Sequence, residues 1–146
     1  MADDREFDAN QELSFNAKNI AEFRATGGTV SGAFEGFDLL LLTSIGAKSG
    51  QERTSPIGRF DIDGKVYIVG SAAGRDANPA WVANIRKTPA VKVEIGANPP
   101  ADAIAAELDP AERDRIFEIV KQRAPGFAGY EAATDRVIPV FEIKPD

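Results

Sequence analysis

Apolar positions along this chain occur in short runs or alternate with polar ones, a pattern typical of β-strands. Between two of these segments stands Asp63-Gly64, a dipeptide that favours a tight hairpin turn. The segments that fit the pattern are 38–44, 54–61, 65–71, 90–96, 102–108 and 136–143. In the last of them Pro139 indicates a sheet edge or a bulge, because proline has no N–H to donate to a neighbouring strand.

Helical signals stand at the start, in the middle and late in the chain. Ser14 is placed to cap the first helix, and Asn78 followed by Pro79 predicts an N-cap and a first helical position for the second. The predicted helical segments are 14–25, 79–88, 109–123 and a short turn at 127–133. We expect a polar N-terminal tail at 1–13 and a single domain at 14–146.

The order of these elements decides the fold class. A doubly wound sheet requires regular alternation of strands and helices, which this chain lacks, whereas a small antiparallel barrel with attached helices accommodates the order. We therefore predict an α+β fold that is mainly β, a barrel with attached helices.

Composition narrows the chemistry. The chain has 146 residues, 43% of them apolar, and a net charge of -6, which argues against nucleic acid as a general partner. It contains no Cys and no His, so a disulfide, a thiolate nucleophile, a Cys/His zinc site and an imidazole base are all excluded. Redox chemistry would therefore need a bound cofactor. No segment is predicted to be a signal peptide or to span a membrane, and we expect a cytoplasmic protein.

One loop concentrates candidate binding groups. Residues 45–56 contain two glycines, the cations Lys48 and Arg53, and three hydroxyl side chains. Such a loop can bind an anion through side chains and backbone amides. The spacing fits neither a Walker loop nor a dinucleotide fingerprint, because no helix follows the glycines. An ordinary polar hairpin loop is the alternative that composition alone leaves open.

Three segments together resemble the deazaflavin-dependent nitroreductase family, whose members have flavin-reductase-like or pyridoxamine-phosphate-oxidase-like split β-barrels. The segments are 40–56, Ser71 with Gly74 and 78–84, and Tyr130 with 134–139. The resemblance implies the deazaflavin coenzyme F420, which has a phosphodiester and a polyglutamate tail. It also implies hydride transfer to a small-molecule electron acceptor, namely a quinone, a nitro compound or an activated enone.

By position, the resemblance implies a substrate-facing, catalytic role for Tyr130 as a hydrogen-bond or proton donor. Lys48, Ser49 and Arg53 would hold the cofactor phosphate. The full set of implied cofactor-binding residues is Lys48, Ser49, Arg53, Thr54, Ser55, Pro56, Ser71 and Trp81. Ala72 stands where some relatives have Lys, a departure that bears mainly on substrate identity.

Each residue has a structural alternative: Trp81 as a core residue, and Tyr130 as a tether for a loop. Two other functions also stay open, a non-catalytic deazaflavin carrier and an FMN-dependent enzyme on the same barrel. No metal is expected, peripheral membrane contact is left open, and a monomer is favoured over an oligomer.

Overall fold

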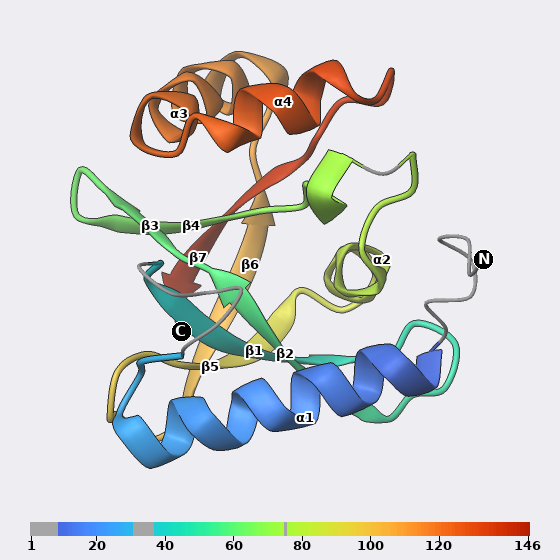
Figure 1. Ribbon diagram of the computed structural model, residues 1–146, viewed down its shortest axis with the longest axis vertical. Coiled ribbons are helices and arrows are strands. Elements are labelled where there is room, and N and C mark those ends of the chain that lie inside the picture. The colour runs from blue at the N-terminus through green and yellow to red at the C-terminus, as the bar shows by residue number, and fades with distance from the viewer. Residues whose placement is uncertain (1–8, 31–36, 75) are drawn as a thin grey trace.

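The computed structural model describes residues 9–30, 37–74 and 76–146. Its described strands form one seven-stranded antiparallel sheet in the order β2-β1-β5-β6-β7-β4-β3 (Figure 1). The strands are β1 (Leu39–Ile45), β2 (Glu52–Gly58), β3 (Phe60–Ile62), β4 (Lys65–Val69), β5 (Ala90–Glu94), β6 (Ala101–Glu107) and β7 (Val140–Pro145). The helices are α1 (Ala9–Thr26), the 3-10 turn η2 (Ala72–Gly74), α2 (Ala80–Lys87), α3 (Pro110–Arg123) and α4 (Gly126–Ala132).

The sheet is covered by helices on both faces (Figure 1). On one face α2 packs Trp81, Val82 and Ile85 into the largest core cluster. On the other face α1 covers β1 through Phe23, and α3 covers β4 and β7 through Ile116 and its neighbours. This mainly antiparallel half-barrel with attached helices is the fold class that the sequence predicted.

Side chains that alternate between the two faces of single strands explain how one sheet contributes residues to three hydrophobic core clusters. In β4, Ile68 belongs to the α2 cluster, whereas Tyr67 and Val69 belong to the α3 cluster. In β1, Leu40 and Leu42 face α2, and their neighbours face α1. Side chains of successive strand residues point to opposite faces, so a strand with apolar residues throughout is buried on both sides.

The predicted hairpin at Asp63-Gly64 is confirmed. Both residues have positive φ, 53° and 77°, as a tight two-residue turn requires, and Ile62 pairs with Lys65 across it. The predicted single strand 54–61 is instead two strands. Strand β2, which pairs with β1, ends just before Arg59. Strand β3 begins just after it and pairs with β4. The backbone amide of Arg59 donates to the carbonyl of Asp38 at this corner.

Two other boundaries differ from the prediction. The first helix begins at Ala9 rather than Ser14, so residues 9–13 of the expected tail are helical, and residues 1–8 lie outside the described part. The last strand begins at Val140 rather than Arg136, and Val137 is 74% exposed. Pro139 has no amide to donate, and its carbonyl accepts from Gly70, so the ladder can begin only after it.

Candidate functional site

The loop between β1 and β2 is a tight, internally bonded turn. The amide of Gly46 donates to the carbonyl of Gln51 at 2.8 Å, and the amide of Gly50 donates to the carbonyl of Gly46 at 2.9 Å. Gly50 has a φ of 71°, and a Cβ on Gly46 would lie 2.5 Å from the hydroxyl oxygen of Ser49. The loop therefore requires Gly50 for its positive φ, whereas a side chain at Gly46 would displace the Ser49 hydroxyl. The loop joins two strands, as predicted.

Helix α2 holds this loop in place. The amide of Ala47 donates to Oδ1 of Asn84 at 2.8 Å, and Nδ2 of Asn84 donates to the hydroxyl of Ser44 at 3.4 Å. Nζ of Lys87 donates to the carbonyl of Ala47 at 2.8 Å. Asn84 and Ser44 are buried, so these bonds satisfy groups that would otherwise be costly to bury.

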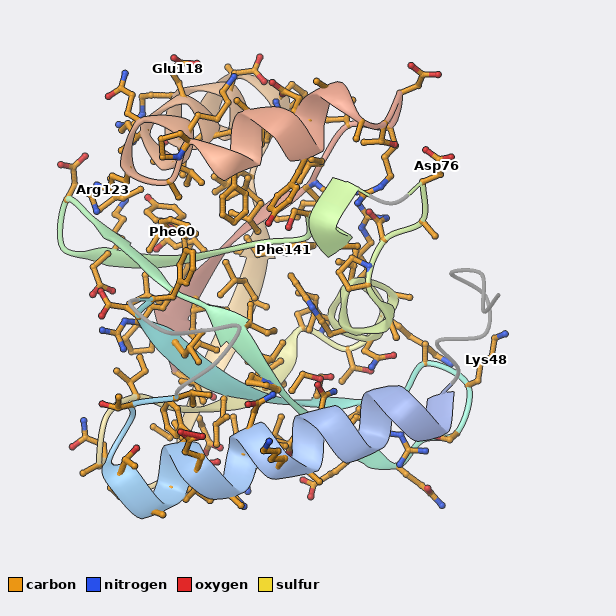
Figure 2. All side chains as sticks on the ribbon, in the orientation of Figure 1. Lys48, Phe60, Asp76, Glu118, Arg123 and Phe141 are labelled. Atoms are coloured by element: carbon orange, nitrogen blue, oxygen red, sulfur yellow. The ribbon has the colours of Figure 1, made fainter. Side chains whose placement is uncertain are left out.

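The cations of the loop remain available. Lys48 and Arg53 are exposed and make no hydrogen bond or ion pair with any described residue. Figure 2 shows Lys48 at the edge of the molecule, directed away from the sheet. The hydroxyl oxygen of Ser49 accepts from the amide of Gln51 at 3.2 Å, which leaves its own proton for a ligand. Two cations and one hydroxyl proton of this region are therefore unbonded within the described residues and accessible to an anionic ligand.

Strand register divides the expected residues of β2 between two faces. Arg53 is opposite Ser44 and Ser55 is opposite Leu42, so both lie on the α2 face. Thr54 and Pro56 lie on the α1 face. Of this second pair, Thr54 shares a 2.8 Å hydrogen bond with Thr43, and Pro56 is buried opposite Leu41. The structure therefore places Arg53 and Ser55 on one face of the sheet and Thr54 and Pro56 on the other.

The second loop, residues 70–79, carries Ser71 and is held by Arg136. The guanidinium donates to the carbonyls of Gly70 and Ser71 at 3.1 and 2.6 Å, and to Oδ1 of Asn78 at 2.6 Å. The predicted N-cap role of Asn78 is wrong, because Pro79 occupies the N-cap and Asn78 serves Arg136 instead. Within this loop Ala72 has a φ of 49°, a strained conformation for a residue with a side chain.

Tyr130 lies beside the second loop. A Cβ on Gly74 would lie 2.9 Å from the carbonyl oxygen of Tyr130, so α4 packs against η2 with no room between them. The ring of Tyr130 meets Phe127 edge-on at 5.2 Å, and Phe127 meets Phe60 in the same way at 5.5 Å. The Tyr130 hydroxyl makes no hydrogen bond with any residue in the described ranges, so it is free to serve as a donor.

Trp81 lies in the core. It is 9% exposed, and its ring contacts Phe141 edge-on at 5.9 Å within the α2 cluster. Figure 1 shows α2, which carries Trp81, between the first loop and the second.

Several cations outside the first loop form ion pairs with described carboxylates. Arg86, one residue before Lys87, bonds Glu107 at 2.8 Å, and that hydrogen bond raises the pKa of Arg86. Hydrogen bonds that Lys121 donates to the carboxylates of Glu131 and Glu118 raise the pKa of Lys121. The charges of Arg113, Arg115 and Lys121 on α3 are therefore matched by neighbouring carboxylates, whereas the charges of Lys48 and Arg53 are not matched by any described carboxylate.

The site residues that sequence reasoning missed are Asn84, Lys87 and Arg136. Asn84 lies within segment 78–84, which contributes to the family resemblance. Its bonding partners are Ala47 and Ser44, about forty residues away in sequence. The guanidinium of Arg136 bonds groups that lie 58 to 66 residues earlier in the chain. No local pattern contains either contact.

A shallow groove of about 140 Å³ lies on the α1 face and is lined by Thr43, Ile45, Glu52, Ala90, Val91, Lys92 and Asp102, none of them an expected cofactor residue. Among the described residues, no group of three or more acidic side chains is arranged to hold a metal ion. In the same part of the chain, no helix is both long and apolar enough to cross a membrane.

Comparison with known proteins adds sequence evidence. The model of a family described as F420H(2)-dependent quinone reductase matches residues 16–145. An F420H(2)-dependent quinone reductase of Mycobacterium tuberculosis is 32% identical over 126 residues, which cover 82% of this chain and 83% of the relative.

Solved structures agree with this result. One described as an F420-H2 dependent reductase is 36% identical, with a TM-score of 0.64 over 73% of this chain and 93% of its own. Another, described as a domain-swapped dimer, is 32% identical, with a TM-score of 0.67 over 94% of this chain and 100% of its own. A NimC/NimA family protein of Clostridium acetobutylicum, 16% identical over 97% of this chain and 87% of its own, shares the fold with a TM-score of 0.53.

Proposed function

This chain belongs to the F420H(2)-dependent quinone reductase family, and from that membership we propose that it transfers a hydride from reduced coenzyme F420 to a quinone. The assignment makes it an oxidoreductase. Nitro compounds and activated enones are a wider proposal, since they too are electron-poor acceptors of two electrons. The named relatives are described only as quinone reductases or F420-dependent reductases.

The observation that carries the proposal is the uncompensated positive charge of the first loop. In a chain of net charge -6, Lys48 and Arg53 flank a rigid turn and have no described carboxylate partner. The backbone amides of Lys48 and Ser49 also have no described acceptor. Cations, free amides and the Ser49 hydroxyl form the donor set that a phosphodiester requires, so these residues fit coenzyme F420.

When bound, reduced coenzyme F420 supplies the hydride from a ring carbon. The chain's own contribution is to hold the reactants in place, an effect worth several kcal/mol for well-oriented partners. Lys48, Ser49 and Arg53 would anchor the anionic part, and the second loop with Ser71 would line the way to the acceptor. We propose that the unpaired Tyr130 hydroxyl donates to the oxygen of the acceptor as negative charge develops on it.

A side-by-side fluorescence titration with F420 and FMN tests the cofactor. We expect micromolar or tighter binding of F420 and much weaker binding of FMN, because FMN lacks the long anionic tail of F420. Tighter binding of FMN would reject the proposal in favour of an FMN enzyme on the same barrel. Steady-state turnover of reduced F420 with a quinone then separates an enzyme from a carrier, since a carrier binds without turnover.

Assembly and location remain predictions. We keep the expectation of a monomer, although one relative is described as a domain-swapped dimer. Cytoplasmic location, with peripheral membrane contact as the alternative, is likewise a proposal that rests on the sequence.

A further inference from the structure

Helix α4, which carries Tyr130, has little stability of its own. It has seven residues, two of them glycines, and no described side chain caps its N-terminus. Glycine is a poor helix former, and a helix this short is marginal without tertiary contacts. None of the residues of α4 is fully buried. The position of Tyr130 therefore depends on the contacts that α4 makes with the rest of the protein.

Glu131, the residue after Tyr130, joins α4 to α3 through two ion pairs. Its Oε1 accepts from Nζ of Lys121 at 3.0 Å, and its Oε2 accepts from Nη2 of Arg113 at 3.5 Å. Each carboxylate oxygen thus bonds a different cation of α3. Figure 1 shows the two helices side by side at one end of the molecule.

The two cations are themselves held in place. Arg113, Phe117 and Lys121 follow one another at intervals of four residues, so they lie along one face of α3. The Arg113 guanidinium lies 4.5 Å from the centre of the Phe117 ring, and the Lys121 ammonium lies 5.3 Å from it. Nε of Arg113 also donates to the carbonyl of Ile138 at 2.9 Å, and the Arg113 side chain is only 11% exposed. Glu131 therefore bonds cations that other contacts already orient.

The contact of α4 with η2 is close but does not set the direction of the helix. A Cβ on Gly74 would lie 2.9 Å from the Tyr130 carbonyl oxygen, so this contact limits how near α4 can come. Apolar packing of Phe127 adds stability but is non-directional. Ion pairs with hydrogen bonds have defined geometry, and adjacent helix residues project about 100° apart. Fixing the direction of Glu131 therefore fixes the direction in which Tyr130 leaves the helix.

We infer that Glu131 is a positioning residue, whose ion pairs with α3 hold the Tyr130 hydroxyl where it can donate to the acceptor. This inference rests on the proposed function, in which that hydroxyl bonds the acceptor oxygen. A donor stabilises developing charge only when it is held in the correct place beforehand. The Glu131 carboxylate bonds the cations of α3, so its effect on turnover is exerted through Tyr130.

A double-mutant cycle on turnover of reduced F420 with a quinone tests this inference. Glu131→Ala should lower kcat about 3- to 10-fold, less than Tyr130→Phe does, and leave affinity for F420 nearly unchanged. In the Tyr130→Phe background the same change should have almost no further effect, because no hydroxyl remains to be positioned. Wild-type kcat in Glu131→Ala, or equal losses in the two backgrounds, would overturn the inference.

Hydrogen exchange of the protein without cofactor or acceptor gives a readout that does not depend on turnover. Amides of α4 should exchange about 3- to 10-fold faster in Glu131→Ala than in the wild-type protein, because the helix opens more often. Exchange in the strands of the sheet should stay the same, which shows that the variant is folded. Wild-type exchange of α4 in Glu131→Ala would count against the inference as strongly as wild-type kcat.

Glu118→Ala is the matched control. Glu118 pairs with the same Lys121 at 3.2 Å and is exposed, but it belongs to α3 and holds nothing on α4. Figure 2 shows Glu118 at the outer edge of the molecule. The change in net charge is the same, so kcat and α4 exchange should both match the wild-type protein. Equal losses in Glu118→Ala and Glu131→Ala would reject the inference in favour of a general effect of charge.

The same experiments separate this inference from the proposed function. If the wild-type protein does not reduce a quinone with reduced F420, the proposed function fails, and the role of Glu131 fails with it. If the wild-type protein is active and Tyr130→Phe lowers kcat, but Glu131→Ala does not, the proposed function stands and only the inference is rejected.

Discussion

The first loop together with the start of β2, residues 46–53, and the second loop, residues 70–79, have similar features in sequence but are held in place by different groups. Each follows a buried strand, and each contains glycines and a serine hydroxyl. The first is held by its own backbone and by α2, through the amide of Asn84 and the ammonium of Lys87. The second is held by a charged group, the guanidinium of Arg136, which reaches it from the chain just before β7.

The difference shows where charge is available for a ligand. In the first loop the structural contacts are made by groups other than Lys48 and Arg53, so both cations remain free for an anion. In the second loop the guanidinium of Arg136 donates to groups of the loop itself, the carbonyls of Gly70 and Ser71 and the side chain of Asn78. A cation near a loop therefore indicates binding only when the acceptors around it leave it unused.

The largest effect should come from Arg136→Ala, which tests the structural side of the comparison. The change removes charged donors from two loop carbonyls and from Asn78, and loss of such partly buried bonds costs about 2–3 kcal/mol. Urea denaturation should show this loss of unfolding free energy. Arg53→Ala is the matched control and should leave stability within about 0.5 kcal/mol. Equal stability of the two variants would contradict the division of roles.

Tyr130→Phe sharpens the comparison at the second loop, where the Tyr130 backbone packs on Gly74. Turnover should fall about 10- to 30-fold, because one donor to a developing oxyanion is lost and water replaces it in part. Affinity for F420 and melting temperature should stay nearly unchanged, because the ring contact with Phe127 remains.

Turnover and thermal unfolding measured on the same variant decide the role of Tyr130. Unchanged turnover with a lower melting temperature would reject the catalytic assignment. Tyr67→Phe changes the other tyrosine, which is buried on the α3 face, and should spare turnover.

The smallest effects should come from the free cations of the first loop. Lys48→Ala and Arg53→Ala should each weaken F420 binding roughly 5- to 10-fold by removing one charge-assisted hydrogen bond at an exposed site. Because both side chains are exposed, the loss should shrink as salt is raised from low to high concentration. Full affinity in both variants, with unchanged circular dichroism, would place the cofactor elsewhere.

Much of the fold was determined by local sequence. Alternating apolar positions predicted the bounds of β5 and β6 to within two residues, because the alternation of side chains along a strand is a local property. Asp63-Gly64 predicted the hairpin, because a preference for positive φ is also local. The first loop and its cations were also identified from sequence, since Gly46 and Gly50 mark a tight turn whatever surrounds it. The family followed from motif order and spacing along the chain.

Only the tertiary structure decided which of these groups act together. The break at Arg59 depends on a change of strand partner, from β1 to β4, that no window of local sequence contains. Register set Thr54 and Pro56 on the face away from Arg53, since a strand sends successive side chains to opposite sides. Asn84 and Arg136 bond partners that lie 37 to 66 residues away in sequence. Such contacts form only when the strands and α2 have packed together.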